Sequence, residues 1–113
     1  MKEEIREVMK RLKEGMIAYI SEDDAPYTEK DIDVCFNILK EYLEKMHQSS
    51  DMEEGMKHVK SAVLALNQLN EACDYCLIET NEREDICEII IMAGHEKGYN
   101  DLEDDITEEW REW

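Results

Sequence analysis

Cysteine is the residue type with the greatest chemical potential in this chain, and three of the four cysteines lie in one short stretch. Cys73 and Cys76 form a CxxC pair, and Cys87 follows eleven residues later. Thiolates bind metal ions and exchange disulfides, so this group could be a metal site or a redox pair. However, structural zinc motifs usually combine two close pairs, and a redox CxxC is expected at a helix start in a βαβ unit. The sequence fits neither pattern.

The cysteines fit the apolar faces of helices better than they fit a site. Cys35 and Cys73 each lie in an apolar stripe, and Cys87 precedes Ile90 and Ile91 on a third apolar segment. Buried thiols behave as small hydrophobic side chains. We therefore expect core cysteines, no metal site and no cofactor. A metal-dependent enzyme or metalloprotein with carboxylate or cysteine ligands is kept as an alternative.

The C-terminal carboxylates are a second group that could bind a cation. Their spacing matches the ligand positions of an EF-hand loop, but Ile106 occupies the position at which the sharp turn requires glycine. The chain also lacks a glycine-rich phosphate loop and a GxSxG motif. The histidines, His47, His58 and His95, fall at polar positions of helical patterns. We predict no catalytic residue and favour a non-enzymatic protein.

Helices must position these residues. Apolar residues recur at spacings of three and four, and the chain has one proline and four glycines. We expect one all-α domain over residues 1–113, a four-helix bundle with a short fifth helix at its C-terminus. The predicted helices cover about residues 2–20, 29–47, 51–75, 82–97 and 105–113.

Local signals refine the helix ends. Thr28 with Asp31, and Ser50 with Glu53, have the spacing of capping boxes, and Thr80 or Asn81 could cap the fourth helix. Gly98 suits a left-handed stop. Asn70 lies within an apolar face, where its amide must find hydrogen-bond partners. We interpret Asn70 as a structural residue that binds the backbone of a helix end or loop.

The charge is large and uneven. The chain has a formal net charge of −17, and residues 71–113 carry 15 acids and three bases. Such a surface repels phosphates and anionic lipids, so direct nucleic-acid or membrane binding is not expected. Residues 1–20, in contrast, have a net charge of +1, and Lys2, Arg6, Lys10 and Lys13 form a basic edge. We expect a cytoplasmic protein whose partner is a basic protein surface.

The acidic C-terminus is the predicted partner-binding segment. Tryptophans supply contact area, and carboxylates steer basic partners. The predicted site residues are Asp101, Glu103, Asp104, Asp105, Glu108, Glu109, Trp110 and Trp113. In a second interpretation the tryptophans pack onto the bundle while the acids meet the basic edge, and both interpretations can hold in part. A homodimer or other self-assembly, suggested by Leu64 on a polar helix side, is a further alternative.

Overall fold

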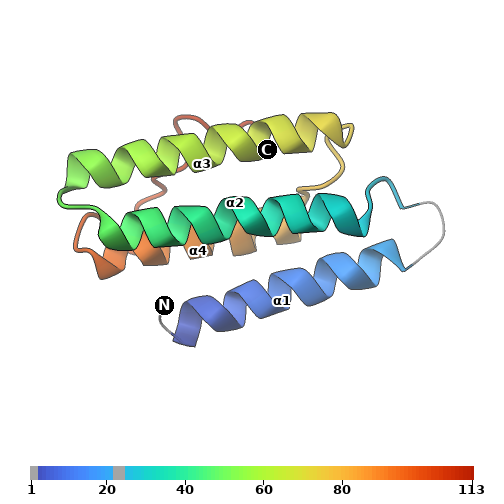
Figure 1. The fold of residues 1–113 in the computed structure, drawn as a ribbon, viewed down its shortest axis with the longest axis horizontal. Coiled ribbons are helices and arrows are strands. Elements are labelled where there is room, and N and C mark those ends of the chain that lie inside the picture. The colour runs from blue at the N-terminus through green and yellow to red at the C-terminus, as the bar shows by residue number, and fades with distance from the viewer. Residues whose placement is uncertain (1–2, 22–24) are drawn as a thin grey trace.

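Four helices make up the regular structure of the part of the chain that the structure describes. The computed structural model describes residues 3–21 and 25–113, and within these ranges it contains no strand. The helices are α1 (Glu3–Ile20), α2 (Glu29–Gln48), α3 (Met52–Ala72) and α4 (Thr80–Glu96). α3 packs on α2 and α1 packs mainly on α4, so α1 and α3 form opposite edges of the bundle (Figure 1). The prediction of an all-α fold is confirmed.

The core is built from the apolar stripes of all four helices. A helix with apolar residues every three or four positions can bury one face and leave the other in water. Cys35 and Cys73 belong to this core, while Cys76 and Cys87 are half-buried. Among the largest fully buried side chains are Ile5, Leu12, Met16, Ile32, Leu39, Met46, Leu66, Ile86, Ile89 and Ile90.

The predicted helix ends lie within a few residues of the observed ones. The box of Thr28 and Asp31 caps α2 as predicted, since Asp31 accepts the Thr28 amide hydrogen at 3.0 Å. The cap of α3 lies one residue later than predicted, at Asp51, whose side chain accepts from the Glu54 amide at 2.9 Å. Lys2 and residues 22–24, which belong to the predicted first helix, its basic edge and the following break, lie outside the described residues.

The turn from α3 to α4 is organised by Asn70. Its side-chain oxygen accepts hydrogen bonds from the Leu77 and Ile78 amides at 3.1 and 2.9 Å, and its carbonyl accepts from the Tyr75 amide at 2.7 Å. These bonds hold Asp74 and Tyr75 at positive φ, where helix cannot continue. As a result α3 ends at Ala72, earlier than predicted, and Asn70 has a structural role. α4 in turn begins earlier than predicted, after Glu79.

The predicted fifth helix over residues 105–113 is wrong. Residues 106–110 form turns instead of a helix, and the last three residues have no regular structure. The Asp105 side chain accepts from the Thr107 amide at 3.0 Å, and such local bonds compete with helix formation. A helix of this length is also marginal by itself. Gly98, at a φ of 77°, does provide the predicted left-handed stop beyond α4.

Candidate partner-binding site

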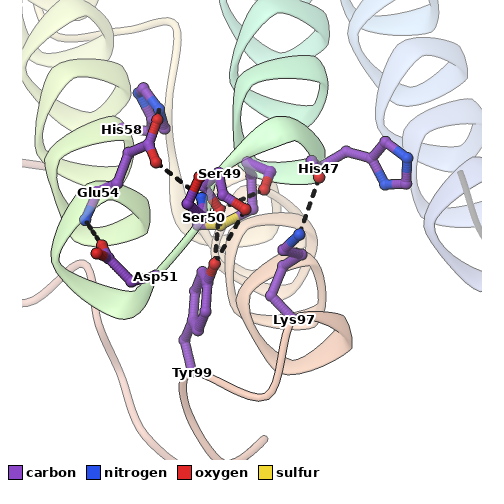
Figure 2. Close-up of polar contacts among 9 residues, drawn as sticks. His47, Ser49, Ser50, Asp51, Glu54, His58, Lys97 and Tyr99 are labelled. Carbon is purple, nitrogen blue, oxygen red and sulfur yellow. Dashed lines mark hydrogen bonds and ion pairs between the residues drawn. The ribbon is translucent and has the colours of Figure 1, made fainter.

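Residues 99–113 form an acidic strap that returns along the bundle and is bonded to α3 and α4. Its first anchor is Tyr99, whose hydroxyl lies 2.8 Å from the Ser49 hydroxyl in the turn between α2 and α3 (Figure 2). The Tyr99 ring lies against Gly55, where a Cβ would come within 2.5 Å of a ring carbon. Beside it, Lys97 donates to the His47 carbonyl at 2.9 Å. Glycine at position 55 is therefore what admits the ring.

The second anchor is Asn100. Its side-chain nitrogen donates to the Ile91 carbonyl of α4 at 3.2 Å, and its carbonyl lies 2.9 Å from His95 Nδ1. Gly94 makes room for the side chain, because a Cβ at this position would overlap Asn100 Oδ1. Both anchors thus depend on a helix glycine that faces the strap.

The middle of the strap is fixed by Thr107, which is fully buried. Asp105 accepts from the Thr107 amide and hydroxyl, and it forms an ion pair with Arg111 at 3.1 Å. The Thr107 hydroxyl also lies 3.5 Å from Cys87 Sγ of α4. Partial burial opposes ionisation, but the bonds from Thr107 and the charge of Arg111 outweigh it and lower the pKa of Asp105.

The end of the strap is clamped by Asn67 of α3. The Asn67 amide donates to the Trp110 carbonyl at 2.8 Å and accepts from the Glu112 amide at 3.0 Å. Trp110 and Trp113 are half-buried and pack against the hydrophobic core. The role of Asn67 was not predicted, since a single amide on a helix gives no sign of what it will bind.

The strap presents its remaining acids to solvent. Asp101, Glu103, Asp104, Glu108 and Glu109 are all exposed. Among the described residues, the ion pair that involves the strap joins Asp105 to Arg111, and both of these residues belong to the strap itself. The expected contact between these acids and the basic edge of α1 is not present in residues 3–21 and 25–113. Lys10 pairs with Glu14, and Lys13 lies over the Phe36 ring.

Cys35 and Cys73 lie in the core, whereas Cys87 is half-buried and Cys76 lines a hollow at the surface. Burial raises the pKa of Cys35 to about 12, with a smaller contribution from nearby Cys73. Burial also raises the pKa of Cys73 and of Cys87. Within the described part of the chain, no three His, Cys, Asp or Glu side chains are placed to hold a metal ion. A neutral thiol in an apolar environment is a poor nucleophile and a poor ligand.

A hollow of about 670 Å³ lies between one end of α1 and the C-terminal ends of α2 and α4. Its apolar wall includes Ile5 and Leu43, and its rim carries Lys40, Lys97, Glu44 and Glu96 as well as His47. The two lysines and two glutamates of the lining balance in charge, so the lining by itself does not select an anion or a cation.

Comparisons with known proteins leave the site to be interpreted from its own geometry. No family model, curated protein or solved structure matches the chain. Across the described residues, every helix is too short or too polar to cross a bilayer.

Proposed function

We propose that this is a non-enzymatic binding protein, of the inhibitor, immunity or adaptor type, which engages a basic surface of a partner protein. The acidic strap makes the contact, and its carboxylates stand in for nucleic-acid phosphates. Asp101, Glu103, Asp104, Glu108 and Glu109 supply the unpaired charge, whereas the predicted site residue Asp105 is paired with Arg111 inside the strap. Trp110 and Trp113 hold the strap in place, and their uncovered edges complete the surface. We place the protein in the cytoplasm.

The observation that supports this proposal most is the combination of a fixed backbone with unpaired surface charge. Asn67 and Tyr99 hold both ends of the strap, so the backbone that carries its carboxylates is held in place. A rigid ligand loses less conformational entropy on binding than a mobile acidic tail would. A dense negative field also speeds the encounter with a basic partner.

The test compares two triple variants with equal net charge. The first carries Glu103→Gln, Glu108→Gln and Glu109→Gln, side chains with no hydrogen bond or ion pair in the described structure. The second, a matched control, carries Asp33→Asn, Glu53→Gln and Glu71→Gln on exposed helix surfaces. Partners are captured from the native host, identified, purified and measured by calorimetry at low and high salt.

We expect the strap variant to bind the purified partner at least about tenfold more weakly than the control, because close charge pairs dominate such contacts. Added salt should weaken binding of the unchanged protein steeply through screening. Equal losses in the two variants would show that net charge matters rather than the strap. Affinity that is indifferent to salt would contradict the mechanism.

A further inference from the structure

A second candidate site lies on the other flank of α4, in a groove between α4 and α1. Two adjoining hollows of about 290 and 520 Å³ share Tyr19, Asn81 and Glu82 in their walls. At Gly15, in the wall of the larger hollow, an added Cβ would meet nothing within 4 Å. The α1–α4 groove is therefore open, in contrast to the flank that the strap covers.

Two tyrosines give this groove an aromatic wall. Tyr19 and Tyr27 are stacked, with ring centroids 5.6 Å apart and an angle of 18° between their planes. Tyr27 is buried, while Tyr19 keeps 43% of its surface exposed. The face of an aromatic ring carries partial negative charge and attracts cations, above all a planar guanidinium. Tyr19 thus offers a binding surface for a positively charged group.

Glu82 provides a carboxylate without a cation in the same wall. One of its oxygens accepts from the Glu79 amide at 3.2 Å, and no basic side chain pairs with it among the described residues. Burial raises the pKa of Glu82, and the nearby carboxylates of Glu79 and Asp85 add to this effect. A half-buried carboxylate in this situation gains stability from any cation that enters the groove.

Arg11, the basic residue in the wall of the groove, does not pair with Glu82. Arg11 of α1 directs its guanidinium to Asp85 at 2.6 Å and to Glu88 at 3.0 Å. Those two acids share one cation, and the Glu82 carboxylate lies outside that group. The groove therefore keeps a net negative charge that fits a cationic visitor.

We propose that the α1–α4 groove binds an arginine side chain from a basic segment of a partner protein. The guanidinium stacks on Tyr19 and donates hydrogen bonds to Glu82. An ammonium group fits this pair less well, because it lacks the flat face and the fork of donors. The site is independent of the strap, which contacts α4 through Cys87, Ile91 and Gly94. The inference therefore goes beyond the proposed function and does not require it.

The test uses the whole chain and a short blocked peptide, acetyl-Ala-Arg-Ala-amide, followed by amide chemical shifts in NMR. We expect saturable shifts centred on Gly15, Tyr19, Asn81 and Glu82. Replacing arginine by citrulline keeps the shape but removes the charge, and it should weaken binding about tenfold or more, as expected for loss of a charge-assisted hydrogen bond. The corresponding lysine peptide should also bind more weakly than the arginine peptide.

Variants separate this site from general attraction to an acidic protein. Glu82→Gln keeps an oxygen for the Glu79 amide and should weaken arginine binding about tenfold. Glu53→Gln removes the same charge from an exposed position at the start of α3, outside both the groove and the strap, and should leave arginine binding unchanged. Tyr19→Phe keeps the ring and should retain binding, whereas Tyr19→Leu should lose it. A lack of shifts, shifts spread over all acidic surfaces, equal binding of lysine, or equal loss in both glutamate variants would overturn the proposal.

Discussion

The two flanks of α4 differ in how they are covered: the acidic strap packs on one, and an open groove beside α1 borders the other. On one flank the strap covers the helix, and Thr107 and Asn100 fill the space beside Cys87 and Gly94. On the other flank α1 leaves an open groove, in which Glu82 has no cation among the described residues. Polar contacts with the strap thus cover one flank of α4, whereas the Glu82 carboxylate on the other flank has no partner cation among the described residues.

The pKa values of two carboxylates, one on each flank, are shifted in opposite directions. On the strap flank, bonds from Thr107 and the charge of Arg111 lower the pKa of Asp105 despite its partial burial. On the groove flank, burial and neighbouring acids raise the pKa of Glu82. One carboxylate is satisfied within the protein, and the other favours a ligand from outside.

The largest change in unfolding free energy is expected for a substitution at Gly94. Gly94→Ala would place a methyl group where Asn100 Oδ1 lies, and overpacking of this kind costs about 1–3 kcal/mol of unfolding free energy. Gly15→Ala is the matched control, because it meets open space in the groove and should stabilise α1 by up to about 1 kcal/mol. Urea unfolding followed by circular dichroism measures both. Effects of the same sign would contradict the contrast between the flanks.

A smaller effect is expected at the Asn67 clamp. Asn67→Ala removes the hydrogen bonds to the Trp110 carbonyl and the Glu112 amide, which together contribute about 1–2 kcal/mol. Both tryptophans of the chain lie in the strap, so their fluorescence reports on it directly. We expect emission at longer wavelength as these rings meet more water. Gln68→Ala, an exposed neighbour on α3, should change neither property.

The smallest expected effects are on the pH dependence of the unfolding free energy, and they have opposite signs on the two flanks of α4. Asp105 has a lowered pKa in the fold, so it stabilises the fold above its unfolded pKa, and this contribution is lost as pH falls through its folded pKa. Glu82 has a raised pKa, so its ionised form weakens the fold at neutral pH, and this penalty shrinks as pH falls through its folded pKa and is gone below its unfolded pKa.

Single neutral variants can detect these signs by urea unfolding at neutral and acidic pH. At neutral pH, Asp105→Asn should lower the unfolding free energy and Glu82→Gln should raise it, each by about 1 kcal/mol or less, because solvent screens both partly exposed groups. Both differences should shrink at acidic pH. Changes of the same sign would show that overall charge repulsion, rather than the local partners, controls the two carboxylates.

Much of the fold could be predicted because its signals are local. Apolar spacing identified the four helices, and the Thr28 and Asp31 pair located the start of α2. The strap could not be predicted in this way. Its carboxylates and tryptophans suggested a fifth helix, but Asp105 bonds to Thr107 and the backbone near Trp110 bonds to Asn67, which is 43 residues away in the chain.

The sequence by itself determined the helical character, the acidic surface and the apolar placement of Cys35 and Cys73. These properties follow from residue type and spacing. Only the tertiary structure decided that Gly55 and Gly94 admit Tyr99 and Asn100, and that Tyr19 and Glu82 share one groove. The physical reason is that periodicity tells which face of a helix is buried, whereas the partner of each face depends on contacts between residues distant in the chain.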